Sequence, residues 1–218
     1  PIQFSDKGRL IDGQHRLQAI LDSGCAVAAW VAFGADDETF AFIDIGKKRT
    51  AADIFAINGV KNCNVVAAAC RWIFGYENDR GFYAGSDSGG GSRRRQTTDP
   101  DPLYRFYMSL DTERLQDSTK VSRWFIQHGL PNPSVAAAIH YVCAGKSRAA
   151  ADEYFEKLAT GIGFLNKSDP AYKVRETLQG DVNRSEQACF TIEGWNATRR
   201  NRRLGRLAFS GGKLPRVA

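Results

Sequence analysis

The sequence has few of the residues from which cross-linked or metal-centred proteins are built. Its five cysteines stand far apart without a Cys-x-x-Cys pair, which argues against a disulfide framework and against a zinc site. We therefore expect reduced core residues in a cytoplasmic protein. Only three histidines are present, so any metal ion is expected to be held by carboxylates and phosphate. The five cysteines are Cys25, Cys63, Cys70, Cys143 and Cys189.

A membrane anchor is not expected either. The uncharged stretch from Ser23 to Ala35 is too short to span a bilayer and contains two glycines. A secretory leader, charged and then apolar, is not recognisable, and a start at Pro1 instead of methionine suggests a trimmed segment. With 43% hydrophobic and 25% charged residues, the composition indicates a globular protein and excludes a disordered or fibrous one.

Acidic residues are scarce in one region only. The net charge of +6 arises between residues 184 and 216, which carry eight basic residues and two acidic ones. A cationic end on a neutral body suggests contact with a polyanion such as DNA. The alternative is a solvated face that keeps the protein soluble, and charge alone does not favour either.

Strands and helices alternate in the first sixty residues. Asp6 and Gly8 predict a turn between two short strands, and the spacing of Leu17, Ile20 and Leu21 is helical. The predicted elements are strands at 1–4 and 10–11, a helix that ends at 23–24, buried strands at 26–33 and 39–45, and a helix at 50–57.

The remaining chain has the spacing of helices. Residues 81–101 are rich in glycine and serine and predict a flexible loop, whose arginines at 93–95 are a mobile, non-specific nucleic-acid tether. We therefore expect an α+β fold, with a small α/β head at residues 1–60 and a mainly helical domain at 61–218. The predicted helices are 64–76, 103–108, 121–128, 134–144, 149–158, 171–178 and 185–207.

The string Asp-Gly-Gln-His-Arg lies where a predicted strand meets a predicted helix. Gly13 lets a ligand approach the backbone, and the first N–H groups and the dipole of the helix favour an anion there. Arg16 adds a two-pronged phosphate donor. Asp12 is placed to hold a phosphate-bound magnesium ion or accept a proton, and His15 to move a proton. Gln14 completes the set of polar side chains.

Local roles are the alternative for these residues. Asp12 would cap the helix, His15 would be a partly buried polar residue, and Arg16 would pair with it. Four polar side chains at one junction exceed what folding requires, so we favour a ligand site.

A second junction repeats the same design. A predicted strand ends at Asp44, a glycine turn follows, and three cations precede a helix that begins near Thr50. The two lysines are expected to form an ordinary basic turn, whereas Asp44, Arg49 and Thr50 are carried forward as candidates. If both junctions open on one side, two glycine turns and two arginines converge on one polyphosphate.

The first string resembles a variant within the superfamily that joins chromosome-partitioning ParB proteins and sulfiredoxin. Residues 1–59 are similar to ParB-like domains of phage and mobile-element proteins. In ParB proteins a Gly-Glu-Arg-Arg type string binds the phosphates of CTP, and in sulfiredoxins Gly-Cys-His-Arg handles those of ATP. Gly13 and Arg16 match both patterns, and His15 matches the second.

This resemblance implies a ParB/sulfiredoxin-like head that binds a nucleotide, with Arg49 as the counterpart of an arginine that completes the site. Gln14 stands where sulfiredoxin has its cysteine and ParB its glutamate, so sulfiredoxin chemistry is not expected and hydrolysis stays open. The asparagine of the second region is absent, with Gly46 near its place. The resemblance also implies a helix that normally precedes Pro1, and a location in the cytoplasm of a bacterial host or a phage-infected cell.

The basic C-terminal region supplies a third set of candidates. Within one predicted helix, several arginines would share a face that follows a phosphate backbone. Trp195 would stack on a base or lie in the core, and the core is favoured because tryptophan is mostly buried. The candidate DNA contacts are Arg199, Arg200, Arg202, Arg203 and Arg206. His128 and His140 have no serine or cysteine at a recognised spacing, so a nucleophilic triad is not predicted.

The leading hypothesis is a ParB-like protein that binds a nucleoside triphosphate with Mg²⁺, either ATP or CTP, and acts on or near DNA. Gly13, Gln14, His15, Arg16, Arg49 and Thr50 would hold the phosphates, with Asp12, His15 and Asp44 as catalytic candidates and Asp12 and Asp44 as metal ligands. Phosphoryl transfer or hydrolysis would follow from positioning and charge neutralisation. The alternatives are a metal-dependent DNA nuclease and a non-catalytic DNA-binding regulator. Oligomer formation stays open.

Overall fold

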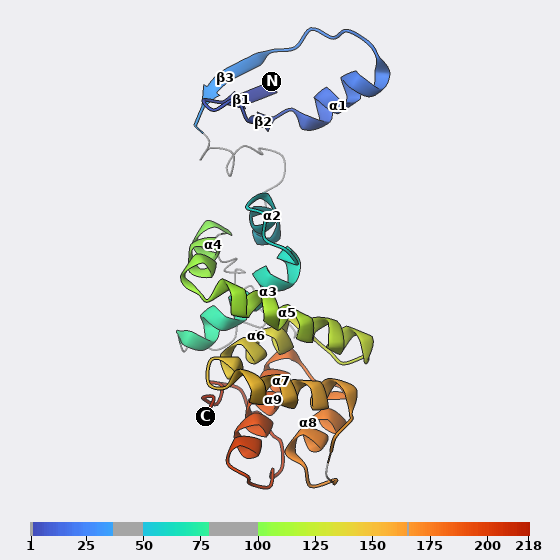
Figure 1. The fold of residues 1–218 in the computed structure, drawn as a ribbon, viewed down its shortest axis with the longest axis vertical. Helices are drawn as coiled ribbons and strands as arrows, with labels where there is room; N and C mark the ends of the chain where they lie inside the picture. The colour runs from blue at the N-terminus through green and yellow to red at the C-terminus, as the bar shows by residue number, and fades with distance from the viewer. Residues whose placement is uncertain (1, 37–49, 79–99, 165) are drawn as a thin grey trace. The chain divides into compact units, whose positions relative to one another are not determined.

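The computed structural model describes residues 2–36, 50–78, 100–164 and 166–218 (Figure 1). The chain divides into two compact units, residues 1–50 and 51–218, and each is described by itself. It is a mixed α and β chain, mostly helical, with a small three-stranded sheet in the first unit. The α+β class expected from the sequence is therefore confirmed at this level.

The first unit begins with the predicted hairpin and helix. Its elements are β1 (Ile2–Ser5), β2 (Leu10–Asp12), α1 (Gln14–Ser23) and β3 (Val31–Ala35). The sheet order is β2-β1-β3, with β2 antiparallel and β3 parallel to the central strand. In the turn, Ser5 Oγ accepts the backbone N–H groups of Lys7 and Arg9, which holds the two strands together.

The expected buried strand at 26–33 is wrong in both position and burial. The strand covers Val31–Ala35, and its side chains are exposed or half-buried. Trp30 just before it is 88% exposed and Phe33 is 77% exposed. The small core of this unit comes from Ile2 and Ile11 instead, and α1 buries none of its side chains. A short apolar run predicts burial only where another layer covers it, and no described element covers this one. The strand expected at 39–45 lies outside the described residues.

All secondary-structure elements in the described part of the second unit are helices. Its core extends from Ala51 to Val217. Helix α2 belongs here, since it packs on α3 and α4, although the sequence analysis placed it in the head. The helices are α2 (Ala51–Ile57), α3 (Cys63–Glu77), α4 (Pro100–Ser109), α5 (Thr112–Gln127), α6 (Pro133–Ala144), α7 (Arg148–Thr160), α8 (Pro170–Leu178) and α9 (Arg184–Arg199). Most of the loop expected at 81–101 lies outside the described residues.

Helix α6 occupies the centre of this unit, with α3 and α5 against it and α7 and α9 on further faces (Figure 1). Nearly all of its side chains are buried, including His140. A helix that is apolar almost all round cannot face water, so its composition places it in the core. The other helices of the unit expose polar faces around it.

Several helices begin where a short polar side chain caps them. Asp111 accepts the backbone N–H of Arg114, and Asp169 that of Ala171. At α9, Asn183 Oδ1 accepts the N–H groups of Ser185 and Glu186, while Glu186 accepts the N–H of Asn183. This reciprocal pair satisfies N–H groups that a helix leaves unbonded at its start.

The predicted continuous helix at 185–207 is wrong at its C-terminal end. Helix α9 stops at Arg199, and Asn201 takes the left-handed conformation with φ of 48°. The N–H of Asn201 then bonds to Thr198 O at 3.1 Å and that of Arg202 to Ala197 O at 2.9 Å. This is a Schellman motif, in which asparagine replaces the usual glycine and turns the chain away from the helix axis.

Trp195 lies in the core, as the sequence favoured, with no exposed surface. Its indole N–H donates to Ala218 O at 3.3 Å. Asn196 binds the same terminal segment, donating to Arg216 O and accepting from the N–H of Ala218, both at 2.8 Å. The basic region is therefore folded onto the helical unit at both of its ends.

The cysteines are free, and Cys70, Cys143 and Cys189 are buried as expected. Cys25 contradicts the expectation, because it lies exposed in the segment between α1 and β3. Cys63 is half-buried at the start of α3. None of the helices in the described ranges is long and apolar enough to cross a membrane.

Candidate functional site

The junction between β2 and α1 has a backbone that only glycine suits. Gly13 has φ of 96°, in the left-handed region, and a Cβ there would lie 2.9 Å from Ile2 Cγ1. Its N–H donates to Asp12 Oδ1 at 2.7 Å. The Asp12 carboxylate therefore supports the turn itself, but it does not cap α1, so the capping role of the alternative interpretation is wrong.

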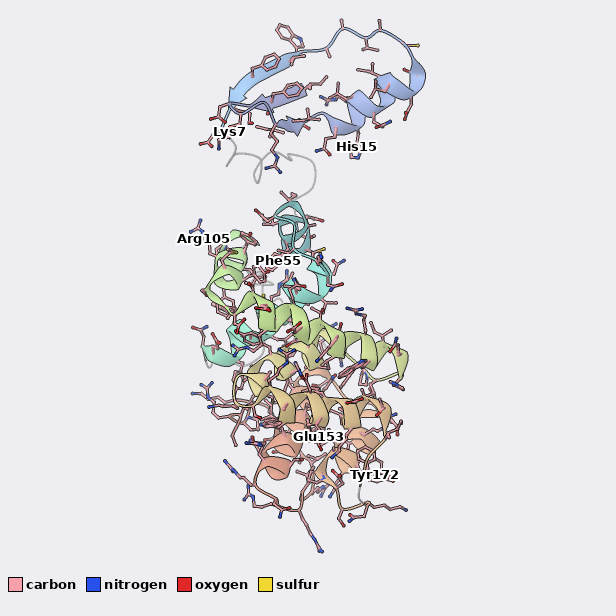
Figure 2. The ribbon with its side chains drawn as sticks, in the orientation of Figure 1. Lys7, His15, Phe55, Arg105, Glu153 and Tyr172 are labelled. Carbon is pink, nitrogen blue, oxygen red and sulfur yellow. The ribbon has the colours of Figure 1, made fainter. Side chains whose placement is uncertain are left out.

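The rest of the string lies in the first turn of α1. Gln14, His15 and Arg16 are all exposed, and no side chain caps this helix. Figure 2 shows His15 projecting outward near the start of α1. The partly buried His15 of the alternative interpretation is therefore wrong. The structure places a left-handed glycine, a helix start without a side-chain cap and three exposed polar side chains at one junction, where an anion would meet the positive end of the helix dipole.

The second junction is described only in part. Asp44 and Arg49 lie outside the described residues, and Thr50 is exposed directly before α2. Convergence of the two glycine turns on one ligand therefore stays a prediction. Among the described residues no group of three histidine, cysteine or carboxylate side chains lies close enough to hold a metal ion. A metal site that combines Asp12 with Asp44 also stays a prediction.

The C-terminal arginines do not share a helical face, because α9 ends before most of them. Arg199 is the last helical residue, and its guanidinium lies 5.7 Å from the Trp195 ring centroid, in a cation–π contact. Arg200, Arg202, Arg203 and Arg206 instead line a pocket of about 370 Å³ beside the end of the helix. The pocket is completed by Glu193, Asn196, Ala197, Leu204 and Gly205.

The four pocket arginines are exposed, and no described carboxylate forms an ion pair with them. Glu193 lines the pocket without pairing, and burial raises the pKa of its carboxyl. The pocket therefore carries a concentrated positive charge with little compensation from the protein. Such a surface attracts anions strongly at low salt.

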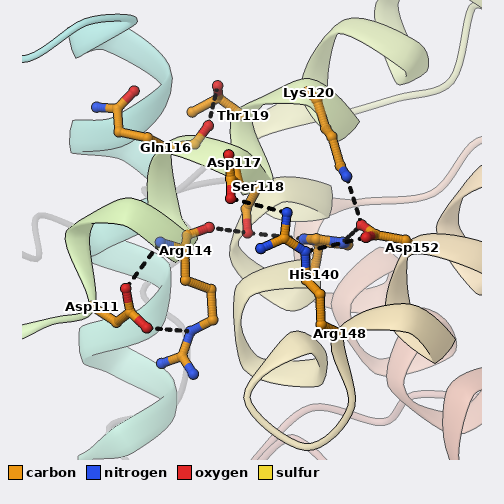
Figure 3. A network of polar contacts seen from close by, with 10 residues as sticks. All are labelled: Asp111, Arg114, Gln116, Asp117, Ser118, Thr119, Lys120, His140, Arg148 and Asp152. Atoms are coloured by element: carbon orange, nitrogen blue, oxygen red, sulfur yellow. Dashed lines mark hydrogen bonds and ion pairs between the residues drawn. The ribbon is translucent and has the colours of Figure 1, made fainter.

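A third polar cluster was not predicted from the sequence (Figure 3). His140 Nδ1 lies 2.9 Å from Ser118 Oγ, and His140 Nε2 lies 3.0 Å from Asp152 Oδ1. Lys120 also binds Asp152 Oδ1 at 2.7 Å. Arg148 bridges Asp152 and Asp117 with ion pairs of 3.1 and 2.9 Å. The only sequence signal for this cluster was the i, i+4 spacing of Arg148 and Asp152 on one helix.

His140 contacts Ser118 with one ring nitrogen and Asp152 with the other, as in a Ser-His-Asp nucleophilic triad. The sequence does not predict this arrangement. Its serine cannot meet a substrate, however, because Ser118 has no exposed surface. The hydroxyl has a single proton and two acceptors within reach, His140 Nδ1 and Arg114 O, the latter at 2.8 Å. The cluster therefore links α5, α6 and α7 and is a structural element.

Burial determines the ionisation of His140, whereas hydrogen bonds determine that of Asp152. Burial lowers the pKa of His140 to about 4, although the Asp152 carboxylate favours the charged ring. Burial also raises the pKa of Asp152, but hydrogen bonds from Lys120, His140 and Arg148 outweigh it and hold that pKa below its usual value. At neutral pH, Nε2–H of a neutral His140 thus donates to an ionised Asp152.

The described fold and sites define a mostly helical α and β protein with two exposed surfaces suited to anions, one in each unit. No profile of a known protein family, no curated protein and no solved structure matches this chain. Its function must therefore be argued from the geometry of those surfaces.

Proposed function

We propose that this chain is a ParB-like nucleotide-binding protein that acts on or near DNA in a phage or mobile-element setting. The observation that carries the proposal is the β2–Gly13–α1 junction, whose left-handed glycine leads into an uncapped helix start with three exposed polar side chains. The Asp-Gly-Gln-His-Arg string at this junction is also the part of the chain that resembles ParB and sulfiredoxin proteins. Geometry and resemblance thus support the same ligand, a nucleoside triphosphate.

Each residue of the junction has a role in this proposal. Gly13 allows the phosphates to approach the backbone, and the N–H groups of the first helical turn donate to them. Arg16 neutralises their charge with its guanidinium fork, and Gln14 and His15 add hydrogen-bond donors. Arg49 and Thr50 would complete the phosphate site.

Magnesium would accompany ATP or CTP. Asp12 uses one carboxylate oxygen for the N–H of Gly13, so its contribution to a metal ion or a proton transfer would come from the other. Asp44 would be the second carboxylate. Hydrolysis or phosphoryl transfer then requires positioning and charge neutralisation, which these side chains supply.

A panel of nucleotides with and without Mg²⁺ tests the proposal by thermal shift. ATP or CTP with Mg²⁺ should stabilise the first unit, which contains the junction, by about 2.7 kcal/mol at ligand concentrations of roughly 100 times Kd. Arg16→Ala should abolish this shift, whereas Arg9→Ala, at the opposite end of β2, should retain it. The proposal fails if no nucleotide shifts the transition or if both variants respond equally.

The arginine pocket favours a second candidate, a non-catalytic DNA-binding regulator. Such a protein would bind DNA without any response to nucleotides. A nuclease, in contrast, would cleave plasmid in a divalent metal without nucleotide and would lose that cleavage in Asp12→Ala. Nucleotide binding, DNA binding and plasmid cleavage can all be measured on one protein preparation, and their results distinguish the three functions.

A further inference from the structure

We infer that the pocket beside the C-terminal end of α9 holds the phosphodiester backbone of DNA without reading its bases. The inference rests on the DNA contact in the proposed function and names the surface that makes it. The sequence predicts that the arginines share one face of a helix. In the structure most of them lie instead on the loop that leaves α9 at Asn201. None of the four pocket arginines contributes to the hydrophobic core.

The charge of the pocket is the first step in the argument. Arg200, Arg202, Arg203 and Arg206 line one pocket of about 370 Å³, and no described carboxylate forms an ion pair with them. The four arginines share the pocket with one carboxylate, Glu193, so a net positive charge remains, and bringing like charges together costs free energy. A bound polyanion would remove that cost, and it would release condensed counterions as it did so.

The loop that carries these arginines is anchored by its other residues. The backbone N–H of Arg202 donates to Ala197 O, and the backbone carbonyl of Leu204 accepts from Lys173 Nζ at 3.3 Å. The Leu204 and Leu207 side chains pack against the helical core. These half-buried leucines, interspersed with exposed arginines, fix the backbone and leave the guanidinium groups on the solvent side. A surface organised in advance loses less conformational entropy when it binds.

The residue types in the pocket favour phosphate. Every cation that lines it is arginine, whose planar fork bonds two phosphate oxygens at once, whereas lysine provides only a point charge. A lipid surface is disfavoured, because none of the strongly exposed large apolar side chains of the described residues lies between 199 and 216. No aromatic side chain lines the pocket, and Trp195 is fully buried, so base stacking has no platform there. Most of the arginines also lie beyond the end of α9, whereas a DNA groove admits a helix or a two-stranded ribbon, so contact with the backbone is favoured.

The test measures binding of the full chain to two fluorescent DNA duplexes of unrelated sequence by anisotropy, between about 50 and about 200 mM salt. Both duplexes should bind equally, because only phosphates are contacted. Arg202→Ala/Arg203→Ala should weaken binding by roughly tenfold or more at the lower salt and reduce the salt slope by about 1.8, or 0.9 for each lost phosphate contact. Arg71→Ala/Arg123→Ala removes the same charge from exposed positions on α3 and α5 and should change affinity by less than about threefold.

Three results would overturn the inference: no binding of either duplex at low salt, equal losses in the two double variants, or a strong preference for one duplex. A polyglutamate peptide that binds as tightly as DNA would also overturn it. Far-ultraviolet circular dichroism of both double variants establishes that they are folded. Failure here is distinguishable from failure of the nucleotide site, because the DNA titration contains no nucleotide and the thermal-shift panel contains no DNA.

Discussion

Gly13 shows how one residue determines the shape of the candidate nucleotide site. Its positive φ turns the chain from β2 into α1, and the absence of a side chain leaves room for Ile2. A left-handed conformation costs an ordinary residue roughly 1–2 kcal/mol. The glycine that would let a phosphate approach is therefore also the residue that the fold requires.

Gly13→Ala should destabilise the first unit more than Gly8→Ala does. Both positions have positive φ, but only at Gly13 does a Cβ meet neighbouring atoms, with Ile2 Cγ1 at 2.9 Å. We expect a loss of about 1–2 kcal/mol for Gly8→Ala and a further loss of roughly 1 kcal/mol or more for Gly13→Ala. Amide hydrogen exchange of β1 and β2 measures both changes, and equal protection in the two variants would contradict the clash.

His140 predicts a specific dependence of stability on pH. Burial lowers its pKa to about 4 in the folded state, against 6.5 for an ordinary histidine. Between these values the unfolded chain binds the proton more readily, so the free energy of unfolding should fall as the pH falls from 6.5 to 4. Above pH 6.5 this contribution is constant, and across the window it reaches about 3 kcal/mol.

Urea unfolding of the wild type and of His140→Gln at several pH values checks this expectation. The variant is less stable at pH 7 because it loses partners in the Ser118–Asp152 cluster, but it should lack most of the decline between pH 6.5 and 4. His15→Gln is the matched control, since that exposed histidine should leave the decline in place. An identical decline in all three proteins would show that other groups cause it.

At the scale of the element, the residues at helix ends are the clearest signals of secondary structure in the sequence. The helix starting near residue 50, the stop at Gly24 and the segment from 134 to 144 were predicted from polar caps, glycines and apolar spacing, and the structure confirms them. The end of α9 was missed because its stop residue is Asn201 and the arginines beyond it continue a helical spacing. Asparagine enters the left-handed region less often than glycine, so it was a weaker signal.

Asn183→Ala should destabilise the helical unit by about 1 kcal/mol, because it removes the acceptor for two N–H groups at the start of α9. Asn183→Ser keeps a capping oxygen and should stay within a few tenths of a kcal/mol of the wild type. Thermal unfolding followed by circular dichroism compares the two. If both variants lost the same stability, the capping hydrogen bonds would not be the cause.

At the scale of the whole molecule, the main core lies entirely within residues 51–218, from Ala51 to Val217. A unit with its own core can fold without the rest of the chain. The first unit has a much smaller core, formed by Ile2 and Ile11 among the described residues, and exposes Trp30 and Phe33. Most of the stability of the protein should therefore come from the helical unit.

A fragment of residues 51–218 should unfold cooperatively, with a Tm within about 2–4 °C of the main transition of the full chain. That interval corresponds to a change of roughly 1 kcal/mol in a domain of this size. Buried Trp195 provides a fluorescence signal for the transition, alongside circular dichroism. A broad transition without cooperativity would show that residues 1–50 are needed for the helical core.

The amino-acid sequence by itself determined the elements whose causes are local. The hairpin turn, the glycine at the start of α1, the helix caps and the buried spacing of α6 each depend on residues within a few positions of one another. Only the tertiary structure decided which distant side chains meet, such as Ser118, His140 and Asp152, and that the arginines line a pocket instead of a helical face. Those contacts depend on how helices pack and where the chain turns, and packing is a property of the folded chain as a whole.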